Sequence, residues 1–251
     1  MARSQRSPGT SAAPADSAGA GRGRAERVEA LLVGESLDTL RIPYAFDAHH
    51  VALVSVGPGS AIDERVRAWS PHLLVRAKGG EHWGWVCKQE AFTLDELEVL
   101  ASPAEDGELR LAIGEPAHGI AGWRLTHRQA RAALSVATRG GEPVVRYADV
   151  ALLASILKDE VLAASLRHLY LEPLEAGRDG GEEMRQTLRS YFAAGRNVSV
   201  AGEAIGVTRQ AVARRLRTAE ESLGRSIAAC GADLEVALRF EQLAATPPSA
   251  P

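Results

Sequence analysis

The chain has 251 residues, 45% of them hydrophobic and 24% charged, a composition that suits a folded protein with one large domain or two modest ones. Its net charge of −3 excludes a protein that coats nucleic acid with its whole surface, but it leaves room for a local basic face. Two cysteines, Cys87 and Cys230, lie far apart, which excludes a disulfide framework and suits a reducing cytosol.

The two ends of the chain have a composition typical of disordered segments. Residues 1–25 are rich in Ala, Gly, Ser and Pro and contain no hydrophobic segment, so we expect a disordered tail and not a secretory signal. Residues 246–251 have the same character. No apolar run approaches the roughly 20 residues that a spanning helix needs. The sequence therefore predicts a cytoplasmic protein without a membrane partner.

Residues 26–140 indicate a short linker helix followed by an α/β domain. Spacing of Val28, Leu31 and Leu32 predicts an amphipathic helix over 24–40, within a linker that we place at 26–43. From 44 to 140 the pattern alternates between strands and helices, with Gly79-Gly80 suited to the positive φ of a hairpin. We expect strands at 50–56, 72–76, 84–88 and 109–113, and helices at 62–69, 93–100 and 122–138. This is the ferredoxin-like order, which buries two helices against one face of a sheet.

Beyond Gly140-Gly141 the chain reads as helical. A strand is predicted only at 144–147, and a helical connector occupies 141–180, with 149–176 as its helix and 177–181 as a hinge. Six apolar residues support that helix by their spacing: Leu152, Ile156, Val161, Leu162, Leu166 and Leu169. We expect residues 181–245 to form a separate all-α domain.

Residues 197–216 carry the sharpest local pattern in the chain. Ser199 can cap a short helix that ends at Gly206, a residue suited to a left-handed C-cap. Val207 would then fill the core, and Thr208 would cap the next helix. Two helices joined by so tight a turn need a small residue where they touch, which Gly202 supplies. The pattern predicts a helix-turn-helix.

The second helix of this motif has a buried side and a basic side. Val212, Leu216, Ala219 and Leu223 fall on one stripe at helical spacing. At about 100° per residue, Gln210, Arg214 and Arg217 face the opposite way, and Arg209 and Arg215 flank them. Residues 196–225 contain six arginines and three glutamates, although the whole chain is acidic. The predicted DNA-binding residues are Thr208, Arg209, Gln210, Arg214, Arg215 and Arg217.

Several of these segments resemble the PucR/CdaR-type transcriptional regulators. Residues 191–224 are similar to the family's C-terminal helix-turn-helix, above all at Gly195–Ser199 and from Arg215 onward. Residues 144–153 resemble its connector helix, and 114–130 resemble its GGDEF-like domain. The resemblance covers about residues 26–245. It implies an α+β chain, in which a ferredoxin-like, GGDEF-like domain over 44–140 precedes a PucR-type helix-turn-helix domain over 181–245.

Two departures from the family pattern limit what the resemblance implies. Family members typically carry an N-terminal sensor, and residues 1–25 offer only a tail, so the effector stays unidentified. The recognition helix begins Thr208-Arg-Gln-Ala211, where the family more often has His-Arg-Asn-Thr. The operator sequence, the target genes and the sign of regulation therefore do not follow from the family.

Two alternatives to DNA binding come from other classes of protein. The helical end could bind a protein partner without touching DNA. Alternatively, Gly79–Trp83 resembles the GGDEF signature of diguanylate cyclases, with Asp47 and Glu81 as conceivable Mg²⁺ ligands. His82 replaces the second acidic residue of that signature, and imidazole is a poor ligand for a hard cation. We expect no enzyme activity, no catalytic residue and no cofactor.

Histidines and tryptophans of the α/β domain are expected to be structural. The adjacent pair His49-His50 would point to opposite faces of a strand, so we predict surface or strand-edge histidines and no metal site. Trp83 and Trp85 share one face of the hairpin and should belong to the core.

The sequence also suggests a homodimer. One recognition helix presents few reading side chains, and two-fold symmetry is the common remedy. The candidate dimer contacts are the long helix at 122–138, the connector at 152–169 and the closing helix at 234–243. We favour the connector, because its apolar residues are too many for one face of a lone helix.

Overall fold

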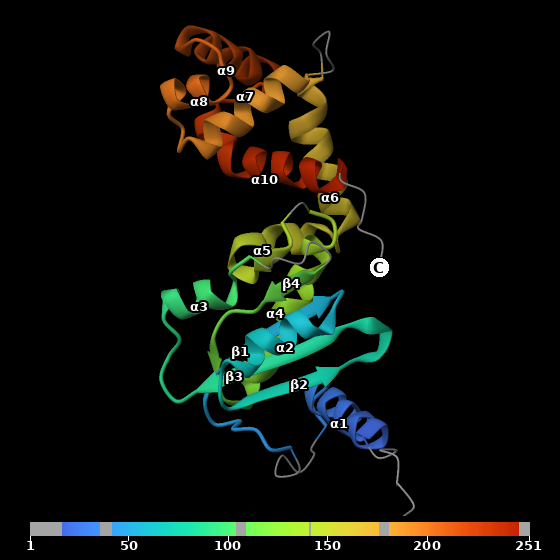
Figure 1. The fold of residues 1–251 in the computed structure, drawn as a ribbon. Helices are drawn as coiled ribbons and strands as arrows, with labels where there is room; N and C mark the ends of the chain where they lie inside the picture. Colours follow the sequence, from blue (N-terminus) through green and yellow to red (C-terminus); the bar gives the residue numbers. More distant parts are fainter. Residues whose placement is uncertain (1–16, 36–41, 104–108, 141, 176–180, 246–251) are drawn as a thin grey trace, which may run out of the picture.

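In the computed structural model of the protein, the described residues are 17–35, 42–103, 109–140, 142–175 and 181–245. They form an α/β half built on one sheet and an all-helical half at its far side, with a helical segment joining the two (Figure 1). The predicted fold class is confirmed. None of the described helices is long and apolar enough to cross a membrane.

The first six elements of the sheet half follow the predicted ferredoxin-like order. They are β1 (His49–Val56), α2 (Gly59–Arg67), β2 (His72–Arg76), β3 (His82–Lys88), α3 (Leu94–Leu100) and β4 (Arg110–Ile113). The strands lie in the order β2-β3-β1-β4, and β1 pairs antiparallel with both β3 and β4. Central β1 is hydrophobic on both sides, as a strand covered on both faces must be.

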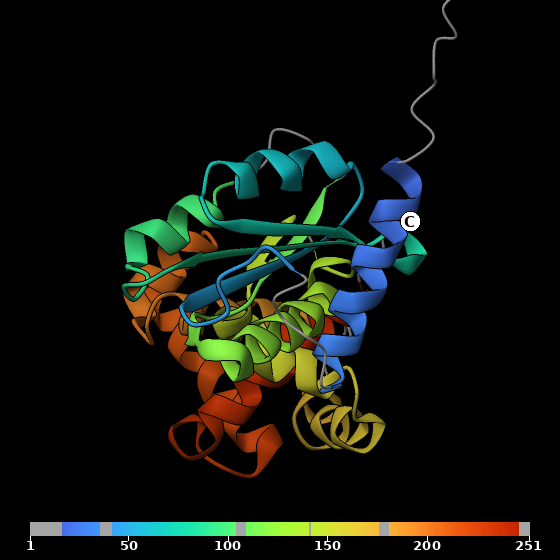
Figure 2. The same ribbon diagram turned by 90° about the horizontal axis from the view of Figure 1, so that it is seen from below.

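Each face of the sheet is covered by different helices (Figure 2). α2 and α3 share one face, where they pack with Val51 and Leu53 of β1. The opposite face, which carries Ala52 and Val54, is covered by the long helix α4 (Gly119–Ala137). The alternation follows the period of two along a strand. The sequence predicted that two helices cover one face of the sheet. It did not predict that α4 covers the other face.

The sheet continues beyond the predicted end of the α/β domain. β5 (Ala117–His118) pairs with β1, and β6 (Val144–Arg146) pairs parallel with β4. The strand expected near 144 is therefore present, but it belongs to the sheet although it lies within the predicted connector. α5 (Tyr147–Ile156) follows and packs on α4 through Val150 and Leu153.

Turn residues act in the sheet half as their chemistry predicts. Gly79 and Gly80 both have φ of 83° in the turn between β2 and β3. Thr93 caps α3: its Oγ1 accepts from the Glu96 backbone N–H at 3.3 Å, while the Glu96 carboxylate accepts from the Thr93 N–H at 2.8 Å. These reciprocal bonds form a capping box, which fixes where the helix starts.

An aromatic cluster fills the face beneath α4. Trp85 stacks on Trp123 at 4.8 Å and on His127 at 5.1 Å between ring centroids. Trp83 is 7% exposed and Trp85 is fully buried. Both tryptophans are thus core residues, as the strand pattern predicts.

One histidine prediction is wrong. His50 is fully buried, not at the surface or the strand edge. Its Nε2 lies 3.0 Å from the Phe46 carbonyl oxygen and its Nδ1 lies 3.0 Å from the Tyr44 hydroxyl. The segment before β1 folds over the strand and supplies both partners, which a strand pattern alone does not reveal. Burial lowers the pKa of His50.

The N-terminal helix is displaced from its predicted place. α1 spans Ser17–Leu32, so residues 17–25 are helical and not part of a disordered tail. It ends before Gly34, whose φ of 93° stops it, and not near residue 40. Val28 and Leu31 lie on one face of the helix, as the spacing predicts, and are buried in the core beneath the sheet. The rest of the predicted tail (1–16), of that helix (36–40) and of the C-terminal tail (246–251) lies outside the described residues.

The connector is not one helix. α5 stops at Ile156, and α6 (Glu160–Leu166) begins after a break at residues 157–159. Asp159 causes the new start, because its Oδ1 accepts from the Leu162 backbone N–H at 2.9 Å. A π-helical turn (Arg167–Leu171) and a 3₁₀ turn (Glu172–Leu174) then complete the segment. Residues 177–180 of the predicted hinge lie outside the described part.

Four helices form the C-terminal half: α7 (Glu182–Ala193), α8 (Val198–Ala204), α9 (Arg209–Leu223) and α10 (Ile227–Ala245). Their shared core includes Leu188, Leu223, Leu234 and Leu238. α10 also reaches the sheet half, since Arg239 Nη2 donates to the Asp149 carbonyl oxygen of α5 at 3.0 Å.

Candidate nucleic-acid interface

A tight turn joins α8 to α9. Gly206 has φ of 69°, the left-handed conformation that lets a helix end abruptly. The Val207 backbone N–H then donates to the Gly202 carbonyl oxygen at 2.9 Å, which closes the turn. The end of the first helix at Gly206 was predicted from the sequence, whereas the hydrogen bond that closes the turn was not.

Gly202 lies where the two helices approach most closely. It is buried, and a Cβ at this position would lie 2.7 Å from the Val207 carbonyl oxygen. Real Cβ atoms essentially never approach a backbone oxygen so closely. The predicted need for a small residue is confirmed, because any side chain here would push α9 away from α8.

The capping residues differ in part from the prediction. Asn197, not Ser199, caps α8: its Oδ1 accepts from the backbone N–H groups of Ser199 at 3.0 Å and Val200 at 3.2 Å. Gly195 and Arg196 both have positive φ, which reverses the chain after α7 and starts the helix two residues early. Thr208 caps α9 as expected, accepting from the Ala211 N–H at 3.2 Å.

α9 buries the predicted stripe. Val212 and Ala219 are fully buried and Leu223 is 9% exposed, with Leu216 half-buried beside them. Val207 was expected to fill the core, but it is only half-buried. The turn presents its backbone to Gly202, so the Val207 side chain stays at the rim of the core.

The opposite side of α9 is open. Arg209, Gln210, Arg214 and Arg217 are exposed. Within the described part of the chain, no carboxylate forms an ion pair with Arg209, Arg214 or Arg217. Four long hydrogen-bond donors therefore lie together on one helix face, and the charge of the three arginines among them is unneutralised by any described carboxylate.

Arg215 is not part of this open face. Its Nη1 donates to the Thr187 hydroxyl at 3.1 Å, and its Nη2 forms an ion pair with Glu183 at 2.9 Å. Thr187 is fully buried, and both partners belong to α7. Arg215 was expected to flank the open face of α9. Its guanidinium is instead bound to α7, which lies against this side of α9.

Thr187 and Glu183 are the residues that the sequence reading missed. They are four residues apart on α7, so both side chains lie on the same side of that helix. Spacing within one helix gives directions relative to that helix alone. No signal in the sequence pairs α7 with Arg215.

The carboxylates considered for a cyclase site are far apart. Asp47 lies just before β1, at the end where His49 pairs with Lys88, whereas Glu81 precedes His82, which pairs with Ser55. Six residues of strand separate these ends, roughly 20 Å at 3.3 Å per residue. The two side chains cannot bind one metal ion. Glu81 instead accepts from the Trp83 indole N–H at 2.8 Å and lies 3.5 Å from Arg131 Nε.

The comparisons with known proteins agree with these two sets of elements. Residues 38–136 match the GGDEF-like domain family, and residues 184–240 match the PucR C-terminal helix-turn-helix domain. A search among curated proteins finds no match. Among solved structures, the chain is similar to the regulator of polyketide synthase expression from Bifidobacterium adolescentis. That likeness has 19% sequence identity, covers 90% of this chain and 99% of the other, and has a TM-score of 0.42.

A GGDEF-like domain followed by a PucR-type helix-turn-helix defines a transcriptional regulator. The chain thus carries both domains, in the order that the resemblance of its motifs to the PucR/CdaR-type regulators implies.

Proposed function

We propose that the protein regulates transcription in the cytoplasm by binding duplex DNA through the open face of α9. The observation that carries this proposal is the contrast among its cations. Arg209, Arg214 and Arg217 are exposed without carboxylate partners, whereas Arg215 is neutralised by α7. A recognition helix needs this arrangement, with its back buried and its donors directed at the major groove.

Each side chain of the open face suits a particular contact with DNA. Arginine can form a bidentate pair with guanine, and glutamine can form one with adenine, so Arg214 and Gln210 are assigned to base edges. Arg209 and Arg217 lie at the two ends of the face and suit phosphates. Thr208 accepts from Ala211 at the start of the helix, and its own hydroxyl proton suits a phosphate oxygen. Arg215 orients α9 and does not touch DNA.

The experiment measures affinity as a function of salt. Protein is titrated against operator DNA chosen by selection from a random duplex pool, and against unrelated duplex DNA, by fluorescence anisotropy. We expect log K to fall linearly with log salt concentration, because bound phosphates release counterions. If the protein binds neither duplex at low salt, the proposal of DNA binding is contradicted and a protein-binding module is favoured.

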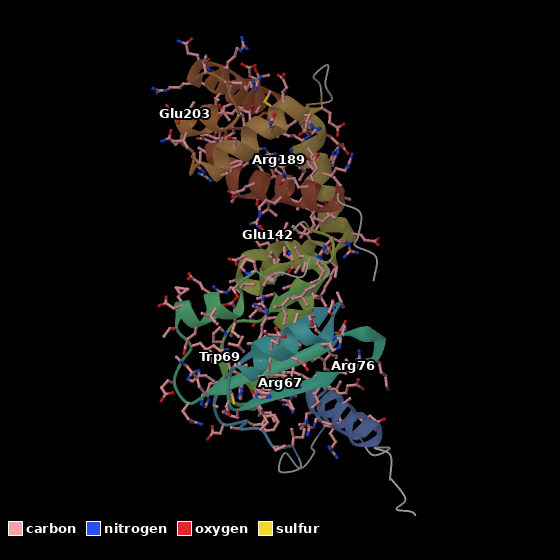
Figure 3. All side chains as sticks on the ribbon, viewed as in Figure 1. Arg67, Trp69, Arg76, Glu142, Arg189 and Glu203 are labelled. Carbon is pink, nitrogen blue, oxygen red and sulfur yellow. The ribbon has the colours of Figure 1, made fainter. Side chains whose placement is uncertain are left out.

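A matched pair of variants tests the assignment of the face. Arg214→Ala should weaken operator binding, whereas Arg67→Ala should not. Arg67 is an exposed arginine in α2, on the opposite half of the molecule from Glu203 of α8 (Figure 3). Each substitution removes one positive charge, so equal losses would show that only net charge matters and would contradict the assignment.

The GGDEF-like domain is proposed to act as a structural domain and not as a nucleotide cyclase. Its signature-like glutamate, Glu81, is bound to Trp83 and Arg131, and its other candidate ligand lies at the far end of the strands. A cyclase needs carboxylates that converge on Mg²⁺ between phosphates.

A further inference from the structure

The joining segment carries apolar side chains that the chain leaves uncovered. Val161 and Leu162 of α6 are 77% and 40% exposed, and Leu169 in the π-helical turn is 46% exposed. The other side of the same segment is buried, with Leu166 and Tyr170 in the core of the helical half. This segment is therefore apolar on two opposite sides, and only one of them has a partner within the chain.

These three residues and Ser165 form one continuous face, which we call the α6 stripe. At 3.6 residues per turn, Val161, Leu162, Ser165 and Leu169 fall within about 100° of arc. Ser165 lies at the centre, and its hydroxyl donates to the Val161 carbonyl oxygen at 2.7 Å. The single polar group of the stripe is thus satisfied within its own helix, and a small residue marks the middle.

The stripe lies on the outside of the molecule. α6 contacts α5 and α10 and then continues into the π-helical turn. Figure 1 shows this segment between the two halves, and Figure 2 shows it at the edge of the molecule. A second chain can therefore approach it without displacing any described element.

Spacing along the stripe is symmetric about Ser165. Val161 lies four residues before it and Leu169 four residues after it. Lys158, in the break before α6, lies seven residues before it, and Glu172, which lies 2.8 Å from His168 Nδ1, lies seven after it; both are exposed. Two copies related by a two-fold axis at Ser165, with their helices antiparallel, would place Val161 against Leu169 and Lys158 against Glu172. Such an isologous contact needs one surface to be complementary to itself, which this one is.

We propose that the α6 stripe binds the α6 stripe of a second copy, as an antiparallel helix pair about Ser165. The occupant is this same chain because the stripe is complementary to itself in shape and charge: a small residue lies at the crossing, an aliphatic pair on each side and an opposite-charge pair at each end. The proposed dimer would present two α9 helices to DNA. That consequence rests on the proposed function, whereas the helix pairing does not.

The contact between the two α6 stripes is small, so we expect the affinity of one copy for the other to be low. Two short helices bury less than the roughly 1,200 Å² of a standard stable interface, so the free dimer should be of the weak class. DNA with two half-sites should strengthen it, since each bound copy raises the local concentration of the other.

Sedimentation equilibrium of the full chain, over concentrations on the order of 1–100 μM, measures the self-association. Val161→Lys should weaken it by at least about tenfold, because a charge would enter the apolar contact. Val99→Lys is the matched control: Val99 is 63% exposed on α3, in the other half, and its substitution should change nothing. Monomers throughout this range, or equal effects of the two substitutions, would overturn the proposal.

A charge exchange tests the antiparallel geometry. Lys158→Glu and Glu172→Lys should each weaken the dimer, and the double variant should restore it, because the cross-chain pair is rebuilt with its signs reversed. Failure of the double variant to recover would show that these residues do not face each other.

Failure of this proposal is distinguishable from failure of DNA binding. Val161→Lys should still bind a single half-site like the wild type, whereas Arg214→Ala should still dimerise. A protein that dimerises but binds no DNA would overturn the proposed function alone. A protein that binds a half-site but never pairs, even on a duplex with two half-sites, would overturn this inference alone.

Discussion

Arg215 of α9 donates to the buried hydroxyl of Thr187 in α7 at 3.1 Å, and the neighbouring Arg214 makes no ion pair with any described residue. Two adjacent arginines of one helix therefore have different surroundings. One is held by the scaffold and the other faces outward, so their substitution should affect different properties.

Replacing Arg214 with alanine should lower DNA specificity and leave stability unchanged. The lost contact is a bidentate pair with a base, worth roughly 1–3 kcal/mol of discrimination between operator and unrelated DNA. Fluorescence anisotropy with both duplexes measures the discrimination, and urea unfolding checks the fold. An unchanged ratio of the two affinities in a folded variant would contradict the base contact.

Replacing Arg215 with alanine should do the reverse. The variant loses a hydrogen bond to a buried hydroxyl and an ion pair with Glu183, whose side chain is 69% exposed. Solvent screens that ion pair, so we expect about 1 kcal/mol of lost unfolding free energy, mostly from the hydrogen bond. The ratio of operator to non-specific affinity should persist. A variant that has wild-type stability but no longer prefers the operator would show that Arg215 contacts DNA.

Gly202→Ala should destabilise the helix-turn-helix. The added methyl group would lie 2.7 Å from the Val207 carbonyl oxygen, and backbone on both sides must move to admit it. Overpacking of this kind costs roughly 1–3 kcal/mol, which urea unfolding measures. Operator affinity should fall as well, because α9 would be displaced relative to α7.

A second glycine serves as the control for that substitution. Gly23 lies in α1, and a Cβ there would have no neighbour within 4 Å. Gly23→Ala should therefore be neutral or stabilise by up to about 1 kcal/mol through helix propensity. Similar losses from both substitutions would contradict the close approach at Gly202.

The sequence predicted the features of this fold that depend on neighbouring residues. Alternating apolar residues with Gly79-Gly80 between them indicate the β2–β3 hairpin, and Gly206 with Thr208 indicates the boundary of α8 and α9. The choice of Asn197 over Ser199 as the cap could not be predicted, because both are good capping residues two positions apart. The choice follows from the positive φ at Gly195 and Arg196.

Features that depend on distant contacts were beyond the sequence pattern. β6 joins the sheet by pairing with β4, more than thirty residues earlier, so a short apolar run gave no sign of which half it belongs to. Arg215 is a second case. Helical spacing gives its direction from the axis of α9, but only the position of α7 decides whether that direction is solvent or protein.

Glu81→Ala should leave DNA affinity intact and lower stability. In the wild type the Trp83 indole N–H donates to the Glu81 carboxylate at 2.8 Å, and Trp83 is only 7% exposed. The variant removes this acceptor. A partly buried donor left without an acceptor costs about 1–3 kcal/mol. Wild-type protein incubated with GTP and Mg²⁺ should yield no cyclic dinucleotide by mass spectrometry. Product from the wild type that disappears in Glu81→Ala would overturn the structural role of this domain.

Stability of the sheet half should fall in mild acid, because His127 is held neutral. Burial between Trp83 and Trp85, and secondarily the charge of Arg131, lowers the pKa of His127 from 6.5 to about 3. Below pH 6.5 the unfolded chain binds a proton that the folded protein excludes, so unfolding becomes more favourable. The contribution of His127 is complete above about pH 6.5 and is lost progressively as the pH falls toward 3, by up to roughly 1.4 kcal/mol per pH unit.

His127→Phe isolates this contribution, because phenylalanine keeps an aromatic ring in the cluster and cannot bind a proton. Urea unfolding of both proteins at pH 7 and pH 5.5 should show that the wild type loses about 1 kcal/mol more than the variant over this interval. The comparison uses the change with pH, so a different absolute stability of the variant does not affect it. His50, whose pKa is also lowered by burial, adds to the acid sensitivity of both proteins equally and cancels in the difference. Parallel losses in the two proteins would show that the His127 ring takes up a proton in the folded state, and that the cluster is open to water.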